Sequence, residues 1–263
     1  MQDSKPNEPQ KQSTQTDNFA AALRGEVPLA VGDVIQRSWD ITLRALPMML
    51  LGVAVLIIVS GVVSGIAESV FPVDAEQPDP RNLMLQQFLS VIFVAPFTAI
   101  VTLMGLKNAR DTKPGLECFA EALRHLPQVL AITFIMSFAV MLLAALFFLI
   151  FGEGAVASAL VLVTAIYFQF AFLLAIPLVL ERGLKVTRAI LASFLVINKK
   201  MFTVLGIYIV LFVIIFISAL PLFLGLIFTF PMSFNVVGVI YNRLIGVPND
   251  TSEIENQPDE AQL

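Results

Sequence analysis

Residues 46–66 read LPMMLLGVAVLIIVSGVVSGI, an unbroken apolar stretch without one charged side chain. At 1.5 Å per residue, a helix of this length spans about 30 Å, the thickness of the hydrocarbon core of a bilayer. Five further uncharged runs follow, at residues 88–106, 129–151, 157–180, 202–220 and 222–241. The sequence therefore predicts an all-α fold, a polytopic membrane bundle of six transmembrane helices.

The positive charges lie almost entirely on one side of these runs. Fifteen of the sixteen Lys and Arg residues lie before the first run, after the sixth, or in the segments that follow the second and fourth runs; only Arg81 lies elsewhere. Cytoplasmic loops of membrane proteins carry an excess of Lys and Arg. We therefore expect both termini in the cytoplasm, with an acidic loop near residues 68–79 and a short turn at residues 152–154 outside.

The composition argues against several classes of protein. Apolar residues make up 57% of the chain and charged residues 14%, against about 25% charged in a soluble domain. The chain lacks a basic face with base-stacking aromatics, so nucleic-acid binding is not expected. It also lacks a phosphate-binding loop, a nucleophile elbow, a zinc-protease motif and a dinucleotide fingerprint. We expect a protein without enzymatic activity.

Cys118 is the only cysteine and His125 the only histidine. One chain can therefore form neither an internal disulfide nor a metal site of several Cys or His residues, and no cofactor is predicted. We interpret Cys118 as a small filler residue near the interface, with S-acylation or redox chemistry as the alternative. His125 is interpreted as a partly solvated residue, with pH sensing as the alternative.

Both ends of the chain are polar. Residues 1–30 are rich in Gln, Asn, Ser, Thr and Pro near the start, which predicts a disordered cytoplasmic tail. Residues 246–263 carry five acidic residues and no basic one, which predicts an acidic cytoplasmic tail. Residues 31–245 between them are expected to form the six-helix membrane domain.

An internal repeat is visible in the membrane domain. Amphipathic segments at residues 31–47, 115–127 and 184–202 precede the odd-numbered runs, with the spacing of helices that lie in the membrane interface. Aromatic residues recur in them at intervals of 80 and 75 residues, at Trp39, Phe119 and Phe194. Each even-numbered run carries one proline that could act as a helix hinge: Pro96, Pro177 and Pro231. The pattern predicts three parallel helix-pair repeats, at about residues 31–110, 111–182 and 183–245.

Two junctions carry a resemblance to known proteins. Residues 95–134 read APFTAIVTLMGLKNARDTKPGLECFAEALRHLPQVLAITF, and residues 176–211 read IPLVLERGLKVTRAILASFLVINKKMFTVLGIYIVL. They are similar to the junctions after the second and fourth helices of uncharacterised bacterial six-helix inner-membrane proteins, the YciC-like family and related integral membrane families of unknown function. The resemblance implies a multipass protein of the bacterial inner membrane. Those families have no established catalytic residues to carry over.

Four residues give the strongest polar signal inside the predicted membrane helices. Tyr167 and Gln169 are in the fourth run, and Ser233 and Asn235 are in the sixth. Primary amides need hydrogen-bond partners in hydrocarbon. The four residues therefore predict either hydrogen bonds that fix helix packing or a small polar site at the centre of the bundle.

Basic residues cluster around the third amphipathic segment, namely Arg182, Lys185, Arg188, Lys199 and Lys200. They are expected either to contact anionic lipid headgroups, at about 1 kcal/mol per charge, or only to set the orientation. Gly61 and Gly65 form a GxxxG motif in the first run, which is typical of close helix packing or self-association.

Two functions fit these observations. The absence of charge inside the runs favours a non-enzymatic envelope protein that supports, scaffolds or regulates other membrane components, since coupled transporters normally carry intramembrane ionisable groups. The alternative is a transporter or channel for a neutral, apolar or lipid-like solute. The expected partners are the bilayer, anionic headgroups on the cytoplasmic side, and other membrane proteins or further copies of the chain.

Overall fold

The computed structural model describes residues 17–74, 79–152 and 154–246, and every regular element in these ranges is a helix. The predicted all-α class is confirmed. The helices are α1 (Phe19–Arg24), α2 (Val31–Arg44), α3 (Leu46–Val70), α4 (Pro80–Ala109), α5 (Glu117–Arg124), α6 (Leu126–Phe151), α7 (Ala155–Ala171), α8 (Ala175–Arg182), α9 (Val186–Lys199), α10 (Met201–Ala219) and α11 (Leu226–Leu244).

Five helical segments are long and apolar enough to cross a membrane. They are α3, α4, α6, the combined α7–α8 segment and α10. The expected sixth transmembrane helix corresponds to α11, which is not among the five. It starts four residues later than predicted, and it includes the polar residues Asn235, Asn242 and Arg243. The structure therefore supports a multispan membrane protein, but not six equivalent spans.

The fourth predicted run is not one continuous helix. The chain leaves helical geometry at residues 172–174, between α7 and α8. Pro177, in the first turn of α8, has no N–H to donate to the preceding turn. The buried Ser193 hydroxyl of α9 repairs the break, because it donates to the Ala171 carbonyl and accepts from the Leu174 N–H, both at 3.0 Å.

The three amphipathic segments are helices, as predicted, and each meets the next long helix through a single residue. The junction residues Ala45, His125 and Lys200 have similar backbone angles, with φ of -109°, -99° and -121°. Pro47 and Pro127 occupy the first turn of α3 and α6, where a missing N–H costs no helical hydrogen bond. The same local sequence pattern therefore produces the same local structure three times.

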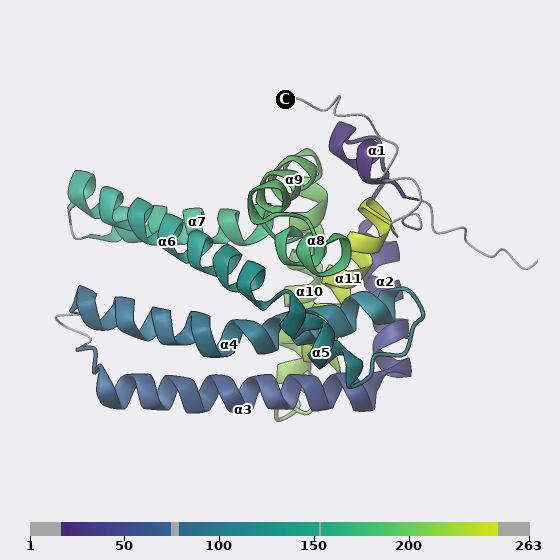
Figure 1. Cartoon of the computed structure of the whole chain (residues 1–263), viewed down its shortest axis with the longest axis horizontal. Helices are drawn as coiled ribbons and strands as arrows, with labels where there is room; N and C mark the ends of the chain where they lie inside the picture. Colours follow the sequence, from purple (N-terminus) through teal and green to yellow (C-terminus); the bar gives the residue numbers. More distant parts are fainter. Residues whose placement is uncertain (1–16, 75–78, 153, 247–263) are drawn as a thin grey trace, which may run out of the picture.

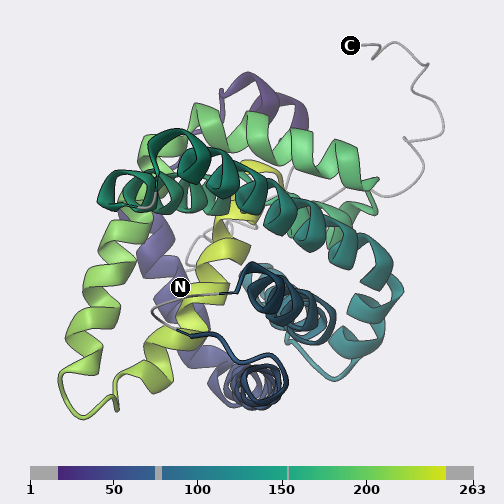
Figure 2. The same ribbon diagram turned by 90° about the vertical axis from the view of Figure 1, so that its left-hand side faces the viewer.

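Two long hairpins lie side by side, and the third does not follow them. Figure 1 shows α3 beside α4 and α6 beside α7, with both hairpins reversing at the same end. In Figure 2, viewed from that end, α3 and α4 are seen end-on, whereas α10 and α11 lie across the view. The α10–α11 hairpin therefore crosses the other two at a steep angle.

The core lies at the basic ends of the helices. There α4 and α11 cross so closely that only glycine fits at the contact. A Cβ added to Gly105 would lie 2.5 Å from the Phe234 carbonyl oxygen, and one added to Gly238 would lie 2.6 Å from the Gly105 carbonyl carbon. A largely buried ion pair between Arg110 and Glu181 joins the carboxyl-terminal end of α4 to that of α8.

The amino-terminal boundary of the folded part lies earlier than expected. Residues 17–30, assigned from the sequence to a disordered tail, contain α1 and pack on α9. Ala22 and Val27 of this stretch are buried in the core. The composition of residues 1–30 as a whole is polar, and for this reason it did not indicate these buried apolar residues. Four stretches lie outside the described residues: the remaining tail residues 1–16, residues 75–78, residue 153, and the acidic tail beyond residue 246.

Candidate functional site

A long groove runs between α4 and the α6–α7 hairpin. It encloses about 1670 Å³ and is lined mainly by α4, α6 and α7, with contributions from α8, α10 and α11. It extends from Leu83 and Gly154, near the hairpin reversals, to Ile176 and Val237, near the core. The described residues that line it include none that is charged. The shape and the lining suit a long apolar molecule.

Hydroxyl and amide groups are placed along this groove. Gln87 of α4 donates to the Ser137 hydroxyl of α6 at 3.0 Å, which joins the two helices across the lining. The hydroxyls of Thr98, Thr102 and Thr133 instead donate to carbonyls one turn back on their own helices. A Ser or Thr that bonds to its own helix adds little polarity to a wall. The groove is therefore mostly apolar with a few fixed polar points.

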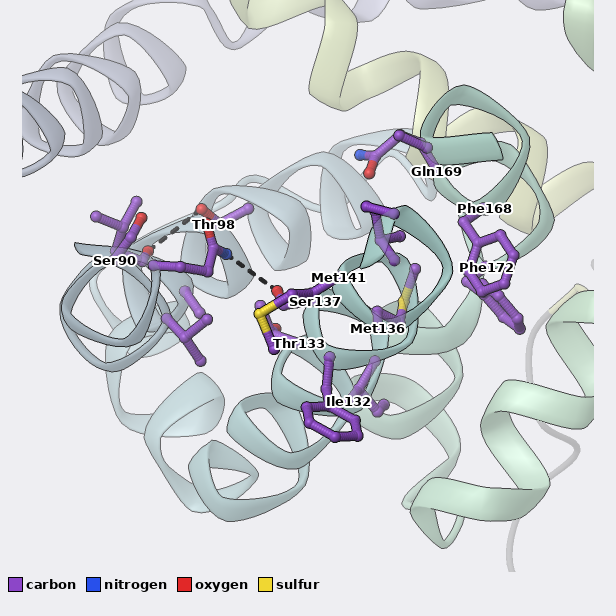
Figure 3. A pocket seen from close by; sticks show the side chains of 18 of the residues that line it. Ser90, Thr98, Ile132, Thr133, Met136, Ser137, Met141, Phe168, Gln169 and Phe172 are labelled. Atoms are coloured by element: carbon purple, nitrogen blue, oxygen red, sulfur yellow. Dashed lines mark hydrogen bonds between the residues drawn. The ribbon is translucent and has the colours of Figure 1, made fainter. Parts of the chain in front are cut away.

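Gln169 is an exposed amide of this lining. Its side chain extends from α7 and its amide is turned toward the side of α4 that carries Thr98 (Figure 3). Among the described residues it has no hydrogen-bond partner, and its side chain is exposed. Ser233 also lines the groove, but its hydroxyl donates to the Phe230 carbonyl at 2.6 Å.

Asn235 lies on the other side of α11, away from the groove. Its amide donates to the Thr42 hydroxyl at 2.7 Å, and its oxygen accepts from Asn108 at 3.1 Å. Asn108 also donates to the Ile41 carbonyl. All members of this network are buried, and it joins α2, α4 and α11. Asn235 therefore performs the packing role that the sequence left as one of two readings.

Tyr167 belongs to neither group. Its hydroxyl donates to the Asn198 side-chain oxygen of α9 at 2.9 Å. The four polar residues that the sequence grouped together therefore separate into three sites. Gln169 and Ser233 line the groove, Asn235 joins the buried network, and Tyr167 ties α7 to α9.

The three prolines have different surroundings. Pro96 and Pro231 lie inside continuous helices, and Pro177 lies at the break between α7 and α8 and lines the groove. A proline inside a helix leaves the carbonyl of the preceding turn without its usual donor. Of these three prolines, only Pro177 lies next to an interruption of its helix.

The basic residues near α9 also divide into two kinds. Lys185, Arg188 and Lys199 are exposed, and no ion pair is formed by them among the described residues. Lys200 is half-buried at the junction to α10. Arg182 is largely buried, since its side chain is 12% exposed and paired with Asp17. The first three side chains are exposed without an ion-pair partner among the described residues, whereas Arg182 has a protein partner.

Arg182 holds the amino-terminal segment in place. Its two terminal nitrogens donate to the Asp17 carboxylate at 3.0 and 2.7 Å, and its guanidinium lies 4.9 Å from the centre of the Phe19 ring. The Asn18 N–H donates to the Ile245 carbonyl at 2.9 Å. Residues 17–24 are thereby fixed across the carboxyl-terminal ends of α8 and α11.

This contact has a defined pH dependence. Burial alone would raise the pKa of Asp17, but the hydrogen bonds from Arg182 and from the Phe19 N–H hold the pKa below its ordinary value. A carboxyl with a lowered pKa stabilises the fold above its unfolded pKa of about 3.9, and the stabilisation is lost as the pH falls through the folded pKa.

We therefore expect the segment to stay bound from neutral pH down to about pH 4 and to detach in stronger acid. Asp17→Asn should detach it already at pH 7, with exchange of the α1 amides about tenfold faster by hydrogen–deuterium exchange, equal to about 1.4 kcal/mol. Glu26→Gln, which removes only the exposed pair with Arg24, is the matched control. Equal exchange rates in the wild type and Asp17→Asn would show that the ion pair does not hold α1.

Four other residues singled out in the sequence occupy structural positions. Cys118 is fully buried in α5, and burial raises the pKa of its thiol, so the reactive thiolate is disfavoured. His125 is the half-buried junction between α5 and α6. A Cβ on Gly61 or Gly65 would meet nothing within 4 Å, so the GxxxG motif does not pack against another described helix of the chain.

The groove-lining hydroxyls were not singled out from the sequence. Thr98 and Thr102, and likewise Thr133 and Ser137, are four residues apart and so share one helix face. This spacing was the available signal for a polar stripe inside the apolar runs.

Comparison of the chain with protein-family models, with curated proteins and with solved structures gives no match.

Proposed function

We propose that the chain is a non-enzymatic integral membrane protein that binds a neutral, lipid-like solute in the groove between α4, α6 and α7, as a carrier or channel for it. The observation that carries this proposal is an uncharged groove of about 1670 Å³ with one unpartnered amide, Gln169. Pockets for small molecules are typically 300–1,000 Å³, so this one has room for long hydrocarbon chains.

The chemistry of the lining supports a neutral ligand. A charged group without a counter-ion inside the membrane is costly, and the described lining offers no counter-ion. An amide in hydrocarbon also needs a partner. A hydroxyl or carbonyl group on an otherwise apolar molecule would satisfy Gln169, and its hydrocarbon tail would contact the Met and Phe side chains of α6 and α7.

The membrane arrangement is part of the proposal. We place residues 31–245 in a bacterial inner membrane with six membrane-embedded helices in three related pairs and both termini in the cytoplasm. What supports this is the segregation of Lys and Arg, the three similar junctions, and the resemblance of residues 95–134 and 176–211 to the YciC-like family.

A scaffold or regulator of other membrane components, which the sequence favours, remains the second candidate. It is favoured by the exposed apolar side chains of the α3–α4 and α6–α7 hairpins, for example Ile58 and Leu149. These side chains could meet lipid, other membrane proteins or a second copy of the chain. A scaffold has no need for a groove lined by fixed polar points, and for this reason we place ligand binding first.

A pair of substitutions on adjacent residues tests the groove. Ala145 lines it, and Leu146 is exposed but does not. We expect Ala145→Trp to abolish retention of dioleoylglycerol by the purified protein in native mass spectrometry, since the indole would fill the groove. Leu146→Trp should retain the wild-type amount. Equal retention by both variants would contradict binding in the groove and return the scaffold to first place.

A second pair tests the amide. Gln169→Leu should weaken dioleoylglycerol binding about three- to tenfold, the value of one hydrogen bond of about 0.5–1.5 kcal/mol. Tyr167→Phe removes a polar group two residues away that faces α9 and should leave the affinity unchanged. Phosphatidylglycerol should bind more weakly than dioleoylglycerol in every variant; tighter binding of the anionic lipid in the groove would contradict a neutral ligand.

A further inference from the structure

The turn between α10 and α11 is unusual for the end of a membrane hairpin. Residues 220–225 read LPLFLG and contain no polar side chain. The side chains nevertheless point outward: Leu220 is 70% exposed, Leu222 85% and Phe223 67%. Three large apolar side chains at the tip of a projecting hairpin form a surface that water solvates poorly.

The tips of the other two hairpins differ. The last turn of α3 carries the exposed Glu68 and the exposed Asp79 precedes α4, while Asn82 donates to the Pro72 carbonyl. The α6–α7 turn is short and flanked by Gly152 and Gly154. Polar groups and a tight reversal suit a turn that emerges into water, and the α10–α11 turn has no such polar group.

Most backbone N–H groups of the α10–α11 turn are paired within the turn, and among its described residues only the Gly225 N–H is without such a partner. The N–H groups of Leu222, Phe223 and Leu224 donate to the carbonyls of Leu220, Ala219 and Pro221 at 2.9–3.1 Å. The N–H groups of Leu226 and Ile227 continue the pattern. Pro221 has no N–H to satisfy. Because an unsatisfied backbone group costs several kcal/mol in hydrocarbon, this turn is suited to a place without water.

The direction of the hairpin agrees with its chemistry. If α3 and α4 cross the bilayer along their axes, then α10 and α11 run steeply inclined to that direction (Figures 1 and 2). The 19 residues of α10 give about 28 Å of helix. A steeply inclined helix covers only part of its length along the membrane normal, so α10 falls short of the core thickness of about 30 Å.

We propose that α10 and α11 form a re-entrant hairpin whose tip, residues 220–225, ends inside the hydrocarbon of the bilayer and does not emerge on the far side. The partner of this surface is the acyl chains of the lipid. The hairpin is anchored at its inner end by the α4–α11 crossing and the Asn235 network. The proposal rests on the membrane location proposed above, and it replaces the last two expected crossings.

Tryptophan depth measurement tests this directly, because Trp39 is the only tryptophan. In a Trp39→Phe background, Phe223→Trp places the single indole at the tip. The protein is reconstituted in vesicles of phosphatidylcholine brominated either near the carbonyl end or near the methyl end of the acyl chain. We expect the tip indole to be quenched at least twofold more by the deep bromines and to be inaccessible to aqueous iodide.

Two reference positions make the result decisive. Native Trp39, on α2 and partly exposed, should be quenched more by the shallow bromines. Ser69→Trp in the Trp39→Phe background, at the outer end of α3, should show the shallow profile and iodide access. If Phe223→Trp and Leu220→Trp both behave like Ser69→Trp, the hairpin crosses completely and the proposal is overturned. If no position is quenched by bromolipid, the membrane location itself fails as well.

Discussion

Gly238→Ala should prevent α4 and α11 from meeting and leave little folded protein. The added Cβ would lie 2.6 Å from the Gly105 carbonyl carbon, and backbone cannot move aside as a flexible side chain can. Overpacking a core costs about 1–3 kcal/mol and sometimes more, and we expect at least about 3 kcal/mol here. The melting temperature in mild detergent measures the loss.

Gly61→Ala and Gly65→Ala are the matched controls for this prediction. Both glycines lie in a helix, and an added Cβ meets nothing within 4 Å. Alanine favours a helix over glycine by about 1 kcal/mol, so these variants should melt at or slightly above the wild-type temperature. A Gly238→Ala variant that melts with them would show that the α4–α11 crossing is looser than described.

Asn235→Leu is expected to be the second most damaging change. It removes two buried hydrogen bonds and leaves the Asn108 amide and the Thr42 hydroxyl short of partners. Each buried polar group without a partner costs about 1–3 kcal/mol, so the expected loss is about 2–4 kcal/mol. Thermal melting of the purified protein and its amount in membranes are the two readouts.

Asn198→Leu serves as the comparison. It removes two exposed hydrogen bonds, one from the Tyr167 hydroxyl and one to the Phe194 carbonyl. Water or lipid headgroups can substitute there, so the change should cost under about 1 kcal/mol. Asn235→Leu should also leave dioleoylglycerol binding unchanged in whatever protein folds, because Asn235 does not line the groove. A folded, stable Asn235→Leu variant that had lost the lipid would place Asn235 in the ligand site.

Features that depend on local spacing could be predicted from the sequence. The uncharged runs form long helices because every backbone N–H and C=O group needs a partner in a core or a bilayer, and a helix supplies these partners internally. Residues 31–44, 117–124 and 186–199 are separate amphipathic helices because apolar residues recur every three or four positions. The charge asymmetry similarly predicts an orientation without reference to any contact.

Features that depend on distant partners could not be predicted. The break at residues 172–174 is completed by Ser193, about twenty residues later. Asp17 is ordered by Arg182, which lies 165 residues away, so a polar composition misleadingly suggested disorder. Gln169 and Asn235 looked alike in sequence, because only the facing helices decide that one amide is paired and the other is not.

The sixth run shows the limit of counting apolar residues. Residues 222–241 are uncharged and long enough to cross, yet Leu222 and Phe223 belong to a turn with φ of 52° and 63°. Leucine and phenylalanine rarely adopt this left-handed conformation, so composition gives no warning of the reversal. The buried face of α11, with Asn235 and Gly238, is decided by α2 and α4 rather than by lipid.

The central claim is that the α3–α4 and α6–α7 hairpins cross a membrane with their basic ends inside. In a Cys118→Ala background, single-cysteine variants are treated with a membrane-impermeant maleimide in intact cells. We predict that Ser69→Cys and Gly154→Cys react at once, whereas Lys113→Cys and Lys185→Cys react only after permeabilisation. Reaction of Lys113→Cys or Lys185→Cys in intact cells, at the rate of Ser69→Cys, would contradict the account.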